Sequence, residues 1–513
     1  MKTSLFLPIK KSQFIFIEKK VIYRKKLHAS KNFSDHYQAV KSGNVPISLQ
    51  ALQNKDKTQG QFIIKYVGES QQNPTGFVFM GQNGDIPINP EDSHFIPSPQ
   101  QISYQILKPG DLYFKSEDPL TEEHAWISFF YHPGEIQSKT NKDISICVNG
   151  IMDGPSTWLE MLSFLEDDVF AVAYPGSGNS SSLESPNIKN IGRHMAQFAR
   201  IICPENTNLS KIGHSLGGGI TMATVYQLLK HYQKDINEKN IKLNTLATLN
   251  TASYSMSLLP APVAALEIPP NLLRISLWSN WIPEELKKAF MKNALEKIFS
   301  NNNITENQKI INQYFNTIFG NPHLLKNQNK LIAGVNWEKV EEFLTQGINL
   351  FAQKIASNDL KRMVITSGVK DSLVPLGYQL RLYQEVFAKT IQETLRQNNN
   401  NIKEAIDTTN KKISLTTFTD TGHMSHQEKA ESTAGILNSS QNQTGIVVKD
   451  QNQLNDIKKS SDFYIPPNAE IKEIPDGIFV QGALPSRNSF PDNNWTGYID
   501  FITQCLDFSK RLI

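Results

Sequence analysis

The segment Gly213–Gly217 (Gly-His-Ser-Leu-Gly) holds a serine between small residues, where an apolar strand pattern ending near Ile212 changes to a helical pattern. A serine on so tight a strand-to-helix turn needs glycine neighbours, because strand and helix come very close together. Its hydroxyl would stand at the carboxyl edge of a sheet, where a helix N-terminus favours developing negative charge. The pattern predicts that Ser215 is a nucleophile. The alternative is an ordinary turn serine.

A serine hydroxyl is unreactive at neutral pH, so it needs a base and a group that orients the base. Two later strand patterns each lead into a loop with such a group. The strand at 363–367 is followed by Asp371, and the strand at 413–418 is followed by His423. Both loops would reach the same sheet edge as the serine. We therefore expect Ser215 as nucleophile, Asp371 as orienting acid and His423 as general base, in that chain order.

Neighbouring residues offer alternatives for the acid and the base. Asp420 is a rival acid, but it lies three residues before His423 on the same loop, and Asp371 would otherwise merely cap a turn. His426 is a rival base, which we expect inside the helix that follows. His214 directly precedes the serine, so its ring should point away from the hydroxyl and act as a packing or hydrogen-bonding neighbour.

The elements that would position these residues alternate between strand and helix. Strand patterns fall at 144–148, 169–174, 209–212 and 245–249. Helical patterns fall at 155–165, 190–202 and 216–229. The alternation resumes after residue 360 with 363–367, 378–395 and 413–418. Strands that alternate with helices indicate βαβ units, and so a mainly parallel sheet with helices on both faces.

Other regions depart from this alternation. Residues 1–140 carry short β-branched and aromatic runs and are expected to form a β-rich region; these runs are 14–17, 61–67, 76–80, 102–107 and 125–131. Residues 258–358 contain three helical patterns, 283–299, 305–319 and 337–355, and are expected to be a helical insertion. Residues 438–462 are rich in Gln, Asn, Ser and Lys, which predicts a flexible polar linker before a C-terminal extension at 463–513.

With these motifs the sequence resembles the α/β-hydrolase superfamily, over roughly residues 143–255 and 360–437. The family's nucleophile elbow falls on 213–217, its acid turn on 368–375 and its Gly-His pair on 422–423. Its oxyanion loop matches 149–151, with Asn149 in place of the usual histidine. Its Gly-x-Gly-x-Ser loop matches 176–180. The resemblance implies an α/β-hydrolase catalytic domain at 141–437, a helical cap at about 258–358 and an extra N-terminal β-rich accessory region.

The resemblance also implies a serine hydrolase that cleaves an ester through an acyl-enzyme, in the manner of a lipase or carboxylesterase. Ser215 would attack the acyl carbonyl while His423 takes its proton and Asp371 steadies the ring. The backbone N–H groups of Ile151 and Leu216 would form the oxyanion hole. No metal or organic cofactor is expected. The alternatives are an acyltransferase that uses the same residues and a non-catalytic binding or scaffold protein.

Composition restricts the partners. The chain has 52 Lys and Arg against 49 Asp and Glu, a net charge of +3, which gives no strong field for nucleic acid. Its cysteines, Cys147, Cys203 and Cys505, lie far apart and show neither a disulfide framework nor a zinc spacing. The expected partner is a small-molecule ester or a lipid, and the sequence does not indicate an oligomeric state. A calcium loop beginning at Asp450 is rejected, because Leu454 and Asn455 stand where a ligand and a glycine are needed.

Targeting signals are weak. No apolar run approaches the ~20 residues that span a bilayer. The first apolar stretch is short, is interrupted by lysines and lacks a cleavage site. We expect a cytoplasmic protein of bacterial type, with secretion as an effector as the alternative. A basic patch at 19–26 would allow peripheral membrane contact, although a solvated strand is the simpler interpretation.

Overall fold

The computed structural model describes part of the chain. The described residues are 62–66, 76–81, 84–87, 112–117, 124–132, 142–151, 153–162, 164–178, 180, 183–184, 186–203, 205–251, 299–300, 337–371, 373–397, 401–439 and 444–486. The statements below concern these residues.

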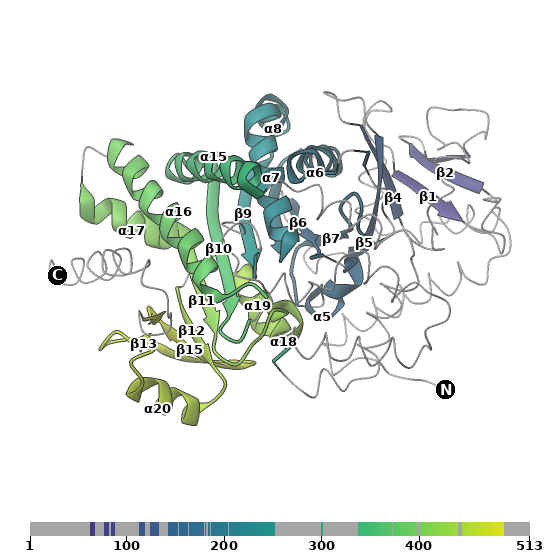
Figure 1. Cartoon of the computed structure of the whole chain (residues 1–513). Coiled ribbons are helices and arrows are strands. Elements are labelled where there is room, and N and C mark those ends of the chain that lie inside the picture. The colour runs from purple at the N-terminus through teal and green to yellow at the C-terminus, as the bar shows by residue number, and fades with distance from the viewer. Residues whose placement is uncertain are drawn as a thin grey trace, which may run out of the picture.

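One large sheet runs through the molecule, in the strand order β14-β15-β12-β11-β10-β9-β8-β6-β7-β5-β4-β1-β2-β3 (Figure 1). Its parallel centre consists of β6 (Lys142–Val148), β7 (Asp168–Val172), β8 (Thr207–His214), β9 (Lys242–Leu249), β10 (Leu360–Gly368), β11 (Ile413–Phe418) and β12 (Gly445–Val448). Antiparallel strands continue it at both edges. They are β1 (Phe62–Tyr66), β2 (Gly76–Gly81), β3 (Gly84–Pro87), β4 (Leu112–Glu117), β5 (His124–His132), β14 (Ile471–Ile474) and β15 (Gly477–Gln481). The short strands β13 (Phe463–Tyr464) and β16 (Leu484–Pro485) pair separately.

Helices cover both faces of the parallel centre. One layer contains α6 (Ile188–Ile202), α7 (Leu216–His231), α15 (Trp337–Ala356), α16 (Leu376–Gln397) and α17 (Ile402–Lys412), which pack in sequence against one another. The other contains the 3-10 turn Pro155–Trp158, α5 (Leu159–Leu162), α18 (Ser425–Glu428) and α19 (Ala430–Asn438). Two further helices, α8 (Gln233–Glu238) and α20 (Gln451–Lys459), lie outside these layers. The fold class predicted from the alternating pattern is confirmed.

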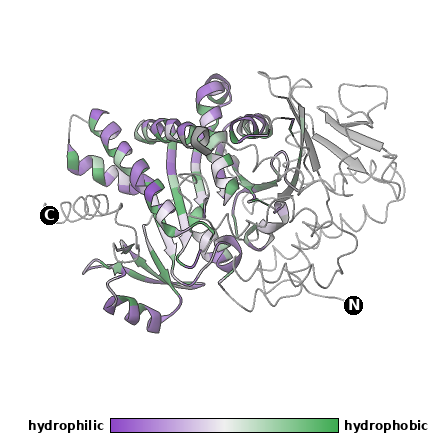
Figure 2. Cartoon of the chain, in the orientation of Figure 1, coloured by the Kyte–Doolittle hydropathy of each residue, from purple (hydrophilic) through white to green (hydrophobic). Residues whose placement is uncertain are grey.

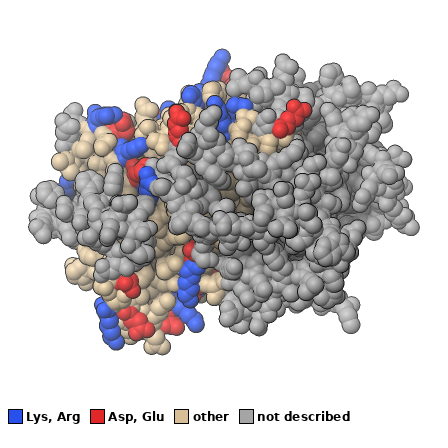
Figure 3. Space-filling view, in the orientation of Figure 1, with Lys and Arg blue, Asp and Glu red and all other residues tan. Residues whose placement is uncertain are grey.

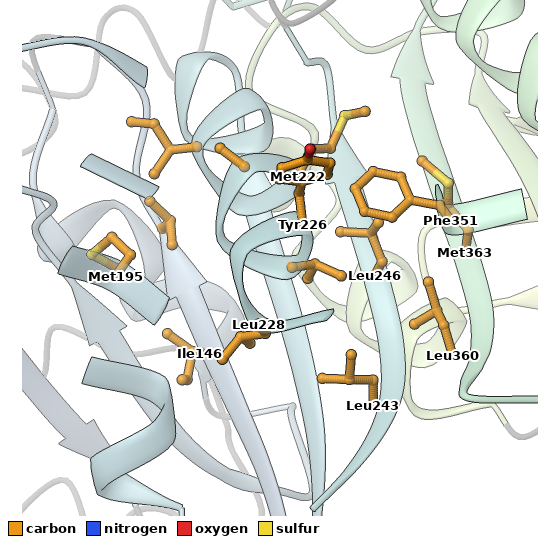
Figure 4. Close-up of a cluster of buried hydrophobic side chains, with 14 of the residues drawn as sticks. Ile146, Met195, Met222, Tyr226, Leu228, Leu243, Leu246, Phe351, Leu360 and Met363 are labelled. Atoms are coloured by element: carbon orange, nitrogen blue, oxygen red, sulfur yellow. The ribbon is translucent and has the colours of Figure 1, made fainter. Parts of the chain in front are cut away.

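The strands of the centre are buried on both sides, because successive residues enter different cores. In β6, Ile146 and Val148 pack in the core beneath α6 and α7, while Cys147 between them packs with Trp158 on the opposite face. Figure 4 shows the first of these cores, which gathers side chains from β9, α7 and α15. The outer helices are amphipathic instead, with α17 and α20 striped in Figure 2. Double-sided burial explains why the central strands read as apolar runs rather than alternating ones.

The linker predicted at 438–462 is wrong. The segment contains β12, which lies inside the sheet between β11 and β15 with all four residues buried, and then α20. In α20 only Leu454 and Ile457 are buried, so the Gln, Asn and Lys residues that suggested a linker are the exposed face of an amphipathic helix. The average composition of residues 438–462 is polar, so the short apolar strand β12 was missed.

The N-terminal region and the helical insertion differ from those predicted. Strands before residue 140 belong to the same sheet, because β5 pairs with β7, so they do not form a separate accessory sheet. The runs 14–17 and 102–107 lie outside the described residues. Of the expected cap, α15 packs against α7, α16 and β10, and most of 258–336 lies outside the described residues. Among the described helices none is long and apolar enough to span a bilayer.

Candidate active site

Ser215 occupies the turn between β8 and α7, with backbone angles φ 53° and ψ −126°. A positive φ is unusual for a residue with a side chain and stores on the order of 1–3 kcal/mol of strain. The surrounding glycines make this turn possible. A Cβ on Gly213 would lie 2.3 Å from the carbonyl oxygen of Gly217, and a Cβ on Gly217 would lie 2.3 Å from that of Asn149. The turn therefore presses against the loop that follows β6.

Replacing Gly217 by alanine should destabilise the protein and distort the loop at 149–151. The new Cβ would meet two backbone carbonyl oxygens, of Asn149 at 2.3 Å and of Val148 at 2.4 Å, and neither can rotate away. We expect Gly217→Ala to lower the free energy of unfolding by about 3 kcal/mol or more, as measured by urea denaturation. Gly435→Ala is the matched control. A Cβ added to Gly435 in α19 would meet no atom within 4 Å, so this replacement should raise the free energy of unfolding slightly. Equal stability of the two variants would contradict the close approach.

Asp371 and His423 form a buried pair. The Nδ1–H of His423 donates to Oδ2 of Asp371 at 2.8 Å, and the residues are only 4% and 5% exposed, respectively. The other carboxylate oxygen, Oδ1, accepts the backbone N–H groups of Leu373 and Val374, each at 2.9 Å. These bonds fix the carboxylate, which in turn fixes the imidazole with its proton on Nδ1. Nε2 is thereby the nitrogen able to accept a proton.

The histidine loop lies against the serine turn through His214. The Nε2 of His214 is 2.8 Å from the carbonyl oxygen of His423, and the two rings have centroids 4.7 Å apart. A Cβ built on Gly150 would lie 3.0 Å from Cβ of Ser215. Three loops therefore meet around the serine. Within the described residues Ser215 and His423 share no hydrogen bond, and catalytic hydrogen bonds of this kind often form only in the substrate complex.

The rival residues are engaged elsewhere. Asp420 forms an ion pair with Lys429 at 3.0 Å. His426 lies in α18, as expected, and its Nε2 is 2.9 Å from Oγ1 of Thr157. Burial, followed by the neighbouring histidines, lowers the pKa of His214 well below its ordinary value, and burial lowers the pKa of His426 to about 3. Both rings are neutral at pH 7 and serve the packing of these loops.

Asn149, which departs from the family's usual histidine, organises the loop after β6. Its Nδ2 lies 2.8 Å from the carbonyl oxygens of Gly150 and Asp153 and 2.7 Å from Oγ of Ser177. The hydroxyl of Ser177 in turn donates to the carbonyl of Asp153 at 3.0 Å. The asparagine thus joins the two loops that the sequence motifs singled out. Ile151 lies on this loop, half-buried, and its N–H and that of Leu216 stay the predicted oxyanion donors.

Sequence reasoning missed two residues of this region. Asn250 follows β9 and donates from Nδ2 to Oδ2 of Asp371 at 2.8 Å. Asn250 lies directly after an apolar strand, and the same kind of position was the signal that predicted Asp371. Asp153 is 4% exposed, and burial raises its pKa to about 7. Its place four residues beyond Asn149 gave no comparable signal. Neither residue is part of a metal site, because the described residues contain no group of acidic, His or Cys side chains suited to one.

The fold family follows from the strands that precede Ser215, Asp371 and His423. A serine on a strained turn follows the central strand β8, an acid follows β10 and a histidine follows β11, all at the carboxyl ends of parallel strands. The chain has the fold of the α/β-hydrolase superfamily. Charged residues of both signs are interspersed on the described surface (Figure 3).

Comparison with known proteins gives distant structural likenesses. No family model and no curated protein sequence matches. Among solved structures, a meta-cleavage product hydrolase from Pseudomonas fluorescens is 15% identical, with a TM-score of 0.40, over 61% of this chain and 93% of the other. A thermophilic esterase from Thermogutta terrifontis is 11% identical, with a TM-score of 0.41, over 63% and 96%. A bacterial membrane phospholipase A is 14% identical, with a TM-score of 0.37, over 68% and 87%. These likenesses do not assign a function, which must be argued from the geometry of the site.

Proposed function

We propose that the protein is a serine hydrolase that cleaves carboxylic esters through an acyl-enzyme on Ser215. The observation that carries the proposal is the buried pair of Asp371 and His423, hydrogen-bonded at 2.8 Å, on a loop that contacts His214, the residue before the strained Ser215. A carboxylate that fixes the proton of an imidazole on Nδ1 leaves Nε2 to act as a base. That arrangement serves to activate a weak nucleophile.

In the proposed reaction Oγ of Ser215 bonds to the acyl carbon of the ester while Nε2 of His423 takes the hydroxyl proton. The N–H groups of Ile151 and Leu216 hold the negative oxygen of the tetrahedral intermediate, and one such donor is typically worth about 3 kcal/mol of barrier. His423 then returns the proton to the leaving alkoxide. A water molecule, deprotonated by the same nitrogen, attacks the acyl-enzyme and releases the acid and Ser215.

Labelling with a fluorophosphonate tests the nucleophile. We expect wild type to bind one probe on Ser215 and Ser215→Ala to bind none, because the probe reacts with an activated serine hydroxyl. Ser210→Ala is the matched control, since Ser210 is a buried serine of β8, the strand that precedes the turn of Ser215. This variant should label like wild type. A wild-type protein that never labels would favour a binding or scaffold protein instead. Undiminished labelling of Ser215→Ala would remove Ser215 from the role.

We further propose a lipase-like or carboxylesterase-like preference for an apolar acyl chain. A series of p-nitrophenyl esters of graded chain length gives the preference directly, and Ser215→Ala gives the background rate. Maximal hydrolysis of the shortest ester would reject the lipase-like proposal. Product analysis with competing alcohols separates hydrolysis from acyl transfer, since an acyltransferase would form a new ester rather than free acid.

A further inference from the structure

Asn250 lies at the centre of the proposed site without a part in the reaction above. It follows β9, the strand between the serine strand β8 and the acid strand β10. Its backbone is in the left-handed region at φ 47°, and its N–H donates to the carbonyl oxygen of Thr366 in β10 at 2.9 Å. The side chain is completely buried. A buried amide must find hydrogen-bond partners, and these partners define what it does.

The partners of Asn250 fix the orientation of its amide. A carboxylate only accepts, so the group that lies 2.8 Å from Oδ2 of Asp371 is the NH2. On the other side, Oδ1 of Asn250 accepts the hydroxyl of Ser425 at 2.7 Å. The NH2 also donates to the carbonyl oxygen of Gly422 at 3.2 Å. The amide therefore bridges the acid and both sides of the loop that carries His423.

Asp371 thereby receives hydrogen bonds on both oxygens. Oδ1 takes two backbone N–H groups, and Oδ2 takes the amide of Asn250 and Nδ1 of His423. Donors on both oxygens restrain the rotation of the carboxylate. The amide and the imidazole share Oδ2, so the amide helps to hold that oxygen toward His423.

We propose that Asn250 is a positioning residue of the active site, which holds Asp371 aimed at His423 and ties both to Ser425. This inference rests on the proposed function. It predicts that a negative charge at position 250 will keep the imidazole of His423 protonated to higher pH, whereas a neutral donor there will not.

Other titratable groups face this site and must be held constant. They are His214 after β8, His426 in α18, Asp153 after β6 and Glu428, whose Oε1 accepts the N–H of Gly422. Burial raises the pKa of Asp153 to about 7, so it titrates within the range of the experiment. It is present in every variant. The ratio of each variant's kcat/KM to that of wild type therefore isolates position 250.

The decisive variant is Asn250→Asp, which is nearly isosteric. It would place a second carboxyl group against Asp371, and two buried carboxylates in contact hold one proton between them. While that proton is present the new carboxyl group donates to Asp371 as the amide does, and hydrolysis continues. When both carboxyl groups are ionised, their charges favour the protonated form of the His423 ring, and the ring can accept the proton of Ser215 only at a pH high enough to remove its own.

The measurement is kcat/KM for a p-nitrophenyl ester from pH 5.5 to 9.5. We expect the ratio of Asn250→Asp to wild type to rise with pH, by at most about tenfold per pH unit, until the ring of the variant has lost its proton. Asn250→Gly, which tolerates the positive φ, removes the donor and should lower kcat/KM at every pH without this rise. Asn358→Asp is the matched control, an exposed asparagine at φ 65°, and should follow wild type.

The outcomes separate the inference from the proposed function. Failure of wild type to label or to hydrolyse any ester defeats the proposed function. An active wild type with an Asn250→Asp ratio that is constant with pH defeats the positioning role. Should Asn250→Asp not fold, Asn250→Gly decides: kcat/KM equal to that of wild type overturns the inference, and a loss at constant KM supports it.

Discussion

Asp371→Asn should lower kcat for ester hydrolysis by about 10⁴-fold at pH 7 while the protein stays folded. Oδ1 of Asp371 accepts two backbone N–H groups, so the amide of the variant must keep its oxygen there and turn its NH2 toward His423. The NH2 then donates to Nδ1, which forces the imidazole proton onto Nε2. A ring in this tautomer cannot accept the proton of Ser215. Steady-state kinetics with a p-nitrophenyl ester measures the loss.

The same replacement at the rival acid is the control. Asp420 pairs with Lys429 and does not contact the imidazole, so Asp420→Asn should change kcat by no more than about threefold. Thermal unfolding of both variants checks that each is folded. If Asp420→Asn were the inactive variant and Asp371→Asn the active one, the orienting acid would be misassigned. A full rate in both would mean that the histidine needs no carboxylate.

The parts of the site that could be predicted from sequence are those with a local signature. The turn around Ser215 needs glycines within a few residues, and Asp371 and His423 each follow an apolar strand on a glycine-containing loop. We predicted that these residues converge because the carboxyl ends of parallel strands lie at the same edge of a sheet. Asn250 also follows such a strand, but an asparagine suggests neither an acid nor a base. Its role exists only through contacts with Asp371 and Ser425, which are 121 and 175 residues away.

Long-range pairing explains the errors in the fold as well. The strand β12 has only four residues, and its burial comes from lying between β11 and β15 rather than from its own pattern. Of the antiparallel strands before residue 140, β1, β2 and β5 were predicted as strands and β3 and β4 were missed. Their union with the sheet depends on the pairing of β5 with β7. Periodicity reports whether a segment is a strand. It does not report which strand becomes its neighbour.

Lys211 is the clearest case of a residue whose environment the sequence conceals. It lies in β8, four residues before Ser215 in the chain, and is completely buried. Its Nζ has no hydrogen-bond partner among the described residues. The titratable groups that act on it are the thiols of Cys203 and Cys147. Burial raises the pKa of Cys147 above its ordinary value, so that thiol offers no negative charge. Burial lowers the pKa of Lys211 from 10.5 to about 7.

The folded protein is therefore less stable at pH 7 than it would be without this amine. Between pH 7 and 10.5 the unfolded chain binds the Lys211 proton more tightly than the folded chain, so this residue makes the free energy of unfolding rise with pH. The slope approaches about 1.4 kcal/mol per pH unit, and the penalty at pH 7 is about 4 kcal/mol. We expect Lys211→Met, which keeps the chain length of the side chain, to raise the free energy of unfolding at pH 7 by about that amount.

The advantage of Lys211→Met should shrink to about 1 kcal/mol at pH 10, where the folded protein holds the amine neutral in any case. Urea denaturation at several pH values measures both quantities. Lys361→Met is the matched control, because Lys361 is exposed near the start of β10 in the same sheet and should change stability little at any pH. A Lys211→Met protein with the pH dependence of wild type would mean that the amine reaches solvent or a partner. The strained turn of Ser215 directly follows β8. If Lys211→Met is more stable than wild type and hydrolyses an ester at the full wild-type rate, the buried amine has no part in the chemistry.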